Sequence, residues 1–382
     1  RRAVQSIYAQ PKWASRPSDT KDRIFSDLVD VVFGLGPLQS LVEDESVTEI
    51  MVNGTKSIFI EREGRIEPCG PLFSNPAQLR ALIDRILAPL GRRVDESSPM
   101  VDARLPNGHR VNIVIPPIAL DGPTITIRKF TDKVMSLEEM ESKGSFDERV
   151  SLLFAWAVKA RKNIAVCGGT GSGKTTLLNA LSCIIAKEER IVTIEDSAEL
   201  RFTEHPHVVR LESRARNAEG VGEVSIRDLV RNALRMRPDR IIVGECRGAE
   251  ALDMLQAMNT GHDGSLTTLH ANSPKDMIMR LVTMVRYGVD LPVDVIERNI
   301  ASAIDLVIQV ARYKDGRRFV SEISVIEQDG LEPCATRPLF ERSGLDACGT
   351  WHALPAWVEE SVAQGLVKES EVKRWRQVPC CS

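Results

Sequence analysis

The stretch GGTGSGKTT at residues 168–176 decides the fold of this 382-residue chain. It fits the pattern G-x-x-x-x-G-K-[S/T], and it stands between the apolar run NIAVC at 163–167 and a predicted helix that continues to about Ala186. Glycines let backbone amides surround a polyphosphate, and the following helix directs its positive N-terminal end at the same anion. The stretch therefore predicts a strand, a phosphate-binding loop and a helix of an α/β nucleotide-binding domain.

The loop residues have the types that hold a nucleoside triphosphate and its metal ion. Lys174 is expected to neutralise the β- and γ-phosphate oxygens, and the Thr175 hydroxyl is expected to hold Mg²⁺. A glycine-rich turn with an incidental lysine is the alternative, and the strand before and the helix after the loop argue against it. The residues expected to bind the nucleotide are Gly168, Gly169, Thr170, Gly171, Ser172, Gly173, Lys174, Thr175 and Thr176.

Two acidic strand ends follow this loop along the chain. The run RIVTIED ends with Glu195 and Asp196, and RIIVGE ends with Glu245 after Gly244. Hydrolysis of a nucleotide requires an oriented water and charge compensation, so both glutamates are predicted to be catalytic, and Glu195 also to hold Mg²⁺ through a water. Gly244 is expected to let the Glu245 carboxylate turn toward the phosphates. For either acid alone, the alternative is a solvated strand end.

The passage GHDGSLTTLH at 261–270 holds two of the six histidines. As metal ligands, His262 and His270 lack a third partner at a recognisable spacing. A histidine that shapes a turn or fills the core is the common alternative. Both nevertheless follow the Glu245 strand, and histidine can donate to a γ-phosphate or to the carboxylate that orients water. Both are therefore candidate catalytic residues, and His270, which ends a predicted strand, is the stronger γ-phosphate sensor.

Composition and missing motifs argue against several other classes of protein. The net charge of −3 gives no overall field that favours nucleic acid, and aromatic residues, at 5%, form no stripe of the kind that binds single strands. The apolar run at 151–158 is too short to span a bilayer. A GTPase would need an N-K-x-D segment, which the sequence lacks.

The chain begins at Arg1 without Met or a signal-peptide pattern, which indicates a fragment of a longer protein.

The eight cysteines form no C-x-x-C pair and show no regular spacing. This argues against a zinc site or a disulfide framework and favours a reducing cytoplasm. The pair at 380–381 is expected to lie in a disordered tail.

The pattern of apolar residues predicts a mixed α+β domain followed by an α/β domain. Residues 1–130 form the first, with a helical lead-in at 1–40 and a hairpin-rich part at 41–130 that turns at Asn53-Gly54 and Asn107-Gly108. A polar linker with at most a short helix covers 131–148. Residues 149–330 alternate helices with short apolar strands, which predicts a largely parallel sheet covered by helices. Residues 331–382 are predicted to be a C-terminal appendage.

Taken together, the motifs resemble those of the secretion-superfamily traffic ATPases, most closely the CpaF-type ATPases of Tad/Flp pilus assembly. In that family GGTGSGKTT is the Walker A loop, TIEDSAEL resembles the Asp box, RIIVGE the atypical Walker B and GHDGSLTTLH the His box. The resemblance covers nearly the whole chain, from FGLGPLQSLVEDESVTEIMVNG onward, and the late PLFERSGLD is similar to the Tad branch.

The resemblance implies a C-terminal RecA-like P-loop NTPase domain that works in a ring, usually a homohexamer, with ATP and Mg²⁺ between its two domains. Arg104, Arg110 and Arg128 match the family's N-terminal arginines and are expected to reach the γ-phosphate as arginine fingers. The implied function is a Mg²⁺-dependent ATP hydrolase that powers pilus assembly or secretion by domain rocking.

Its implied location is the cytoplasmic face of the inner membrane, on a platform protein and without nucleic acid. A ring-shaped nucleic-acid-translocating ATPase is the alternative, and a non-catalytic nucleotide-binding scaffold is a second rival.

Overall fold

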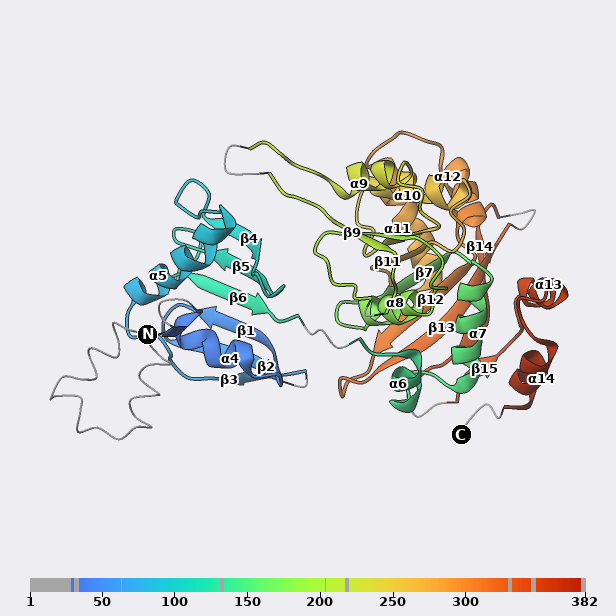
Figure 1. The fold of residues 1–382 in the computed structure, drawn as a ribbon, viewed down its shortest axis with the longest axis horizontal. Helices are drawn as coiled ribbons and strands as arrows, with labels where there is room; N and C mark the ends of the chain where they lie inside the picture. The colour runs from blue at the N-terminus through green and yellow to red at the C-terminus, as the bar shows by residue number, and fades with distance from the viewer. Residues whose placement is uncertain are drawn as a thin grey trace. The chain divides into compact units, whose positions relative to one another are not determined.

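The structure is a computed structural model that describes residues 29–30, 34–62, 64–130, 134–202, 204–216, 220–328, 332–344 and 348–378. The chain divides into two compact units, Arg1–Thr131 (unit 1) and Asp132–Ser382 (unit 2), drawn as ribbons in Figure 1. The helical lead-in predicted at 1–40 lies outside the described residues, except for 29–30 and 34–40.

Unit 1 contains a six-stranded antiparallel sheet in the order β3-β2-β1-β6-β5-β4. Both predicted hairpins are confirmed, because Asn53 pairs with Ser57 across one turn and Arg104 pairs with Arg110 across the other. Alternate strand residues and the apolar side of α5 form one core. The elements are η1 (Gly36–Leu38), α4 (Gln39–Glu43), β1 (Val47–Asn53), β2 (Ser57–Arg62), β3 (Arg65–Pro68), α5 (Pro76–Leu87), η2 (Ala88–Leu90), β4 (Met100–Arg104), β5 (Arg110–Val114) and β6 (Thr124–Arg128).

Unit 2 contains a nine-stranded sheet in the order β15-β14-β13-β12-β7-β11-β10-β8-β9. The strands from β12 to β9 in this order are parallel, and β13 to β15 extend the sheet antiparallel from β12. The strands are β7 (Ile164–Gly168), β8 (Ile191–Glu195), β9 (Val208–Glu212), β10 (Arg240–Val243), β11 (Leu266–Leu269), β12 (Leu306–Arg312), β13 (Arg318–Glu327), β14 (Ala335–Glu341) and β15 (Thr350–Trp351). The predicted α/β fold class is confirmed.

Helices cover both faces of this sheet, because successive strand residues point to opposite sides. Ile164 and Val166 of β7 pack with α7 and α8 in one core, whereas Ala165 and Cys167 pack with α9 to α12 in the other. The helices are α6 (Leu137–Ser142), α7 (Glu148–Lys159), α8 (Lys174–Cys183), α9 (Ile226–Ala233), α10 (Glu250–Asn259), α11 (Pro274–Arg286), α12 (Val293–Ala303), α13 (Trp357–Ala363) and α14 (Glu369–Gln377). Among the described residues, no helix has the length and apolar character needed to cross a bilayer.

The segments set apart as a linker and an appendage pack into unit 2. Leu137 and Met140 of α6 belong to the same core as α7, and so do Phe340 of β14 and Trp375 of α14. Figure 1 shows α13 and α14 beside α7 at the end of the sheet. The boundary predicted at 331 is therefore absent from the packing, because β14 and β15 satisfy their backbone groups on the edge of the sheet that carries the nucleotide loop.

The spacing of the cysteines argued against a disulfide framework, and among the described residues one cysteine is nevertheless bonded. Cys348 is disulfide-bonded, whereas Cys69, Cys167, Cys183, Cys246 and Cys334 are free thiols. Disulfide formation depends on the proximity of two Cβ atoms in space, which spacing along the sequence does not reveal. The pair at 380–381 lies outside the described residues.

Candidate functional site

The loop at 168–176, Glu195, Glu245 and His270 all lie at the carboxyl edge of the parallel strands. The loop follows β7, Glu195 ends β8, and His270 directly follows β11. Glu245 follows β10 and is fixed from both sides, since Cys246 N donates to Thr268 O (2.8 Å) and Thr268 Oγ1 donates to Gly244 O (2.7 Å). In open α/β sheets this edge is where ligands bind.

The glycines of the loop are required by close backbone approaches. A Cβ atom on Gly168 would lie 2.4 Å from Val310 O and 2.5 Å from Ser172 Oγ. Gly173 adopts φ +98° at the N-cap of α8, a backbone conformation that side chains rarely allow. The loop is thus shaped by strand β12 on one side and by the start of α8 on the other.

Lys174 folds back onto the loop in this structure. Its Nζ donates to Gly169 O at 2.9 Å, and Ser172 Oγ donates to the same carbonyl at 2.8 Å. Gly169 and Thr170 are exposed at the tip of the loop, whereas Thr175 and Thr176 are half-buried in the first turn of α8. The loop is therefore held closed on itself by groups that phosphate oxygens can replace.

A chain of polar side chains joins the lysine to both acidic strand ends. Lys174 Nζ lies 3.4 Å from His270 Nδ1, and His270 Nε2 lies 3.0 Å from Glu245 Oε1, in contact but without the alignment of a hydrogen bond. Glu245 Oε2 accepts from Arg247 NH2 at 2.6 Å, and Arg247 NH1 lies 3.5 Å from Asp196 Oδ2. Sequence reasoning missed Arg247, whose only signal was its position two residues after Glu245.

Burial and the lysine favour the neutral form of His270. Burial, and then the charge of Lys174, lower the pKa of His270, while burial lowers the pKa of Lys174 itself. Nδ1 faces the lysine ammonium and must accept, so we assign the ring proton to Nε2, which faces the Glu245 carboxylate. His270 can therefore relay the position of Lys174 to Glu245.

Glu195 is almost fully buried, with 3% of its surface exposed. Its Oε2 accepts from the backbone amides of Glu199 (2.6 Å) and Leu200 (2.9 Å), whereas its buried Oε1 has no hydrogen-bond partner. Burial raises the pKa of this carboxyl above its usual value. Glu195 thus fixes the segment that follows β8, and its second carboxylate oxygen is buried and accepts no hydrogen bond.

The expectation for Gly244 needs correction. A Cβ atom at this position would lie 2.8 Å from Glu195 Cγ, so glycine is needed because the Glu195 side chain packs on the backbone there. The sequence suggested the orientation of Glu245 as the reason for Gly244, whereas the close contact is with the Glu195 side chain.

The structure places His262 far from the other candidates. It precedes β11 on the amino side, and its Nδ1 lies 3.3 Å from Ala257 O of α10. His270 follows the same strand at the carboxyl edge, and a strand of four residues spans about 13 Å. His262 is therefore not brought to the site, because the strand between the two histidines crosses the sheet.

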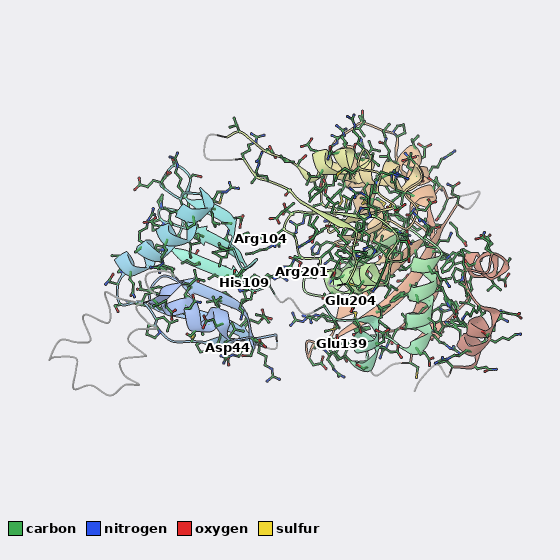
Figure 2. All side chains as sticks on the ribbon, in the orientation of Figure 1. Asp44, Arg104, His109, Glu139, Arg201 and Glu204 are labelled. Atoms are coloured by element: carbon green, nitrogen blue, oxygen red, sulfur yellow. The ribbon has the colours of Figure 1, made fainter. Side chains whose placement is uncertain are left out.

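The three predicted arginines of unit 1 stand in one row across its sheet. Arg104 pairs with Arg110, Arg110 pairs with Arg128, and Arg128 pairs with Glu49 in the registers of β4, β5, β6 and β1. Directly paired residues point to the same face of a sheet. Figure 2 labels Arg104 and His109 at the end of the β4–β5 hairpin, where this row begins. Three cations are thus gathered on one face, which no spacing in the sequence indicated.

A cavity of about 360 Å³ opens beside the loop within unit 2. Ser172, Gly173 and Thr176 line one part of it. The remaining lining residues are Met135, Met140, Lys143, Ser145, Val310, Gly316, Arg317, Arg318, Phe319 and Val320. Arg318 Nε also donates to Gly171 O at 2.9 Å. The cavity combines apolar walls with cations at the loop, a lining that suits a nucleotide base and its first phosphate.

Comparison with known proteins identifies relatives over most of the chain. The family model described as type II/IV secretion system protein matches residues 33–372. A Mycobacterium tuberculosis protein whose name refers to conjugal transfer is 38% identical over 84% of this chain and 93% of its own length. The type IV secretion system protein VirB11 of Bartonella henselae is 34% identical over 77% of this chain and 92% of its own length.

Solved structures agree with this assignment. The Legionella pneumophila ATPase DotB matches with a TM-score of 0.55 and 25% identity, over 79% of this chain and 82% of its own. The pilus retraction motor PilT with bound ADP matches in fold, with a TM-score of 0.56 and 22% identity, over 75% of this chain and 81% of its own. The expected RecA-like ATPase domain preceded by an N-terminal domain is thereby confirmed. The chain therefore belongs to the type II/IV secretion ATPase family, whose members hydrolyse ATP.

Proposed function

We propose that this ATPase binds ATP along residues 168–176 and places the base in the 360 Å³ cavity beside the loop. The single observation that carries the proposal is the series of side-chain contacts from Lys174 through His270 to Glu245 at the carboxyl edge of the sheet. It joins a phosphate-binding cation to a carboxylate that can orient water, and these are the two groups that hydrolysis of a nucleotide requires.

Magnesium fits the oxygen atoms that the site offers. Oε1 of Glu195 is a buried acceptor without a hydrogen-bond partner, and Thr175 lies in the first turn of α8. Mg²⁺ is usually held by one or two protein oxygens, waters and substrate phosphates. The Thr175 hydroxyl would hold the ion directly and Glu195 through a water. Bound there, the ion would neutralise charge on the phosphates.

Hydrolysis follows from the protein groups around the γ-phosphate. Phosphate oxygens replace Gly169 O and His270 as partners of the Lys174 ammonium. The Glu245 carboxylate orients the attacking water and takes up its proton, and Nε2–H of His270 faces that carboxylate. When the γ-phosphate leaves, Lys174 returns to His270, so the histidine reports the loss of phosphate.

The arginine row of unit 1 would supply the remaining charge. The three side chains start from paired positions on one face of the sheet, and Glu49 stands at the end of the same row. We propose that Arg104, Arg110 and Arg128 face the γ-phosphate from the neighbouring domain or a neighbouring subunit of a homohexamer. Hydrolysis would then change the position of one domain relative to the other and produce the stroke of the motor.

We further propose that the motor powers assembly of a Tad/Flp pilus or a related type II/IV secretion system. The segment PLFERSGLD and the resemblance to the CpaF-type ATPases support this assignment. The partner would be a membrane platform protein at the cytoplasmic face of the inner membrane, with no nucleic acid bound. A ring-shaped nucleic-acid-translocating ATPase is the alternative.

One experiment separates these possibilities. The ATPase rate per subunit is measured against protein concentration, together with particle mass, in the presence and absence of DNA. The proposal expects the rate to rise as rings form and to ignore DNA. A rate that is independent of assembly would contradict the ring, and a rate that rises only with DNA would favour the translocase. Nucleotide binding without turnover, even in assembled particles, would indicate a scaffold.

A further inference from the structure

The C-terminal segment, residues 332–344 and 348–378, contacts α7 and the turn between α6 and α7. Trp375 Nε1 of α14 donates to Arg149 O at 2.9 Å, and the Arg149 guanidinium carbon lies 5.0 Å from the centre of the Trp375 ring. Trp156 Nε1 of α7 donates to Glu371 Oε2 at 3.2 Å. The C-terminal segment therefore contacts α7 near both of its ends, and α7 directly follows α6 and its turn.

Arg342, at the end of β14, reaches that turn directly. Its NH1 donates to Gly144 O at 3.1 Å, and its Nε donates to Gly344 O at 3.0 Å. Its guanidinium carbon lies 5.8 Å from the centre of the Phe319 ring. A planar guanidinium can donate in several fixed directions and stack on an aromatic ring at the same time, which an ammonium cannot do.

These contacts join two walls of the cavity beside the nucleotide loop. Phe319 and Val320 of β13 line the cavity, and so do Met140 of α6 and Ser145 of the turn after it. Val320 N donates to Ser145 O at 2.9 Å, so the walls already meet at one backbone hydrogen bond. Arg342 adds a second connection, from the Phe319 ring to the Gly144 carbonyl, and it is not itself among the residues that line the cavity.

We propose that Arg342 is a positioning residue that sets the width of the base cavity, and that the C-terminal segment acts on the nucleotide site through it. The inference rests on the proposed placement of the base in this cavity. Arg342 contacts residues that line the cavity and does not line it itself. Its loss should therefore weaken binding of the base without changing the contacts between the loop at 168–176 and the phosphates. Affinity for ATP should therefore change more than turnover.

The test compares ATP with inorganic tripolyphosphate, which reaches only the loop. In the full chain, Arg342→Ala should raise the KM for ATP roughly fivefold, the factor that corresponds to one net hydrogen bond. It should leave inhibition by tripolyphosphate and kcat unchanged, and Arg342→Lys should recover part of the affinity. Arg337→Ala is the matched control, because Arg337 lies on β14, the strand that ends just before Arg342, in an exposed ion pair with Glu327, and does not line the cavity.

The outcomes are distinguishable. An equal loss of affinity for ATP and tripolyphosphate, or no loss for either, would overturn the positioning role. If Lys174→Ala hydrolyses ATP as well as the unmodified protein, the proposed function itself fails, whatever Arg342 does. Thermal unfolding of each variant checks that the assay temperature lies well below Tm. If Arg342→Ala does not fold, Arg342→Gln takes its place in the same comparison of ATP with tripolyphosphate. Glutamine is uncharged and cannot make all the contacts of the guanidinium.

Discussion

His270 and Glu245 meet at the carboxyl edge of the parallel sheet, with His270 Nε2 3.0 Å from Glu245 Oε1. One residue follows β11 and the other follows β10, and the two strands are neighbours. The other ring nitrogen of His270 lies 3.4 Å from Lys174 Nζ. The histidine thus stands between the phosphate-binding cation and the carboxylate that we propose as the base, and several measurements can test this arrangement.

Glu245→Gln should lower steady-state ATPase activity by about 100-fold or more, the usual contribution of a general base. The amide keeps the size of the side chain but cannot take up a proton. Lys174→Ala should abolish activity as well, with a loss of nucleotide binding that Glu245→Gln does not share. Glu360→Gln on the exposed side of α13 is the matched control. Undiminished turnover in purified Glu245→Gln would remove this residue from the mechanism.

His270→Ala should leave ATP binding nearly intact and lower kcat roughly 10- to 100-fold, as expected for the loss of one charge-assisted hydrogen bond. The reason is that His270 contacts Lys174 and Glu245 and belongs to no part of the loop itself. Binding by titration and turnover under saturating ATP separate the two effects. His262→Ala, at the opposite edge of the sheet, is the control. Loss of binding without a separate turnover defect would indicate a structural histidine.

The free energy of unfolding should decrease as the pH is lowered, in part because of His270. Its pKa is lowered from 6.5 in the folded protein, so the unfolded chain binds more protons between the lowered pKa and 6.5. The contribution of His270 to the free energy of unfolding is therefore fully present above pH 6.5 and is lost as the pH falls from 6.5 to the lowered pKa. Between about pH 7.5 and 5.5, Tm should fall less in His270→Gln than in the unmodified protein. Equal pH dependence of the two proteins would show that His270 does not titrate as described.

At least one of Arg104→Ala, Arg110→Ala and Arg128→Ala should lower kcat about 1,000-fold, the typical worth of an arginine finger. Arg65→Ala, an exposed arginine on β3 of the same sheet, is the control. If the arginine acts on a neighbouring subunit, mixing the inactive variant with Lys174→Ala restores activity at about a quarter of the interfaces in randomly mixed rings. Failure of the mixture to recover would place the arginine and the loop in one subunit.

Gly264→Ala should destabilise the fold by several kcal/mol, in the range seen when a buried ion pair is broken. A Cβ atom there would lie 1.9 Å from NH1 of Arg240, whose buried guanidinium holds Glu189, Val158 O and Gly264 O. Gly261→Ala is the matched control, since Gly261 also has a positive φ (+92°) but nothing within 4 Å, and should cost about 1–2 kcal/mol. Urea unfolding of both variants measures the difference, and equal losses would contradict the role of Arg240.

Local patterns predicted the elements of the site well. The loop at 168–176, the strand ends at Glu195 and Glu245 and both hairpins of unit 1 depend on residues close together in the chain, such as glycines at tight turns and apolar runs before an acid. Strand β11, which ends before His270, was predicted for the same reason.

Long-range pairing decided the rest. The segments at 134–148 and 335–377 looked peripheral because few of their apolar residues repeat at regular spacing, and their partners lie on α7 and β13. Arg247 and the packing of Glu195 on Gly244 depend on contacts between strands, and no single stretch of sequence records them.

The sequence by itself determined the phosphate loop and the acidic strand ends, because both are properties of short stretches with fixed spacing. Only the tertiary structure decided that His270 lies beside Lys174 and Glu245 and that His262 does not, since β11 separates the two histidines along its length. It also decided that Arg104, Arg110 and Arg128 form one row, because strand register places residues from three separate strands side by side.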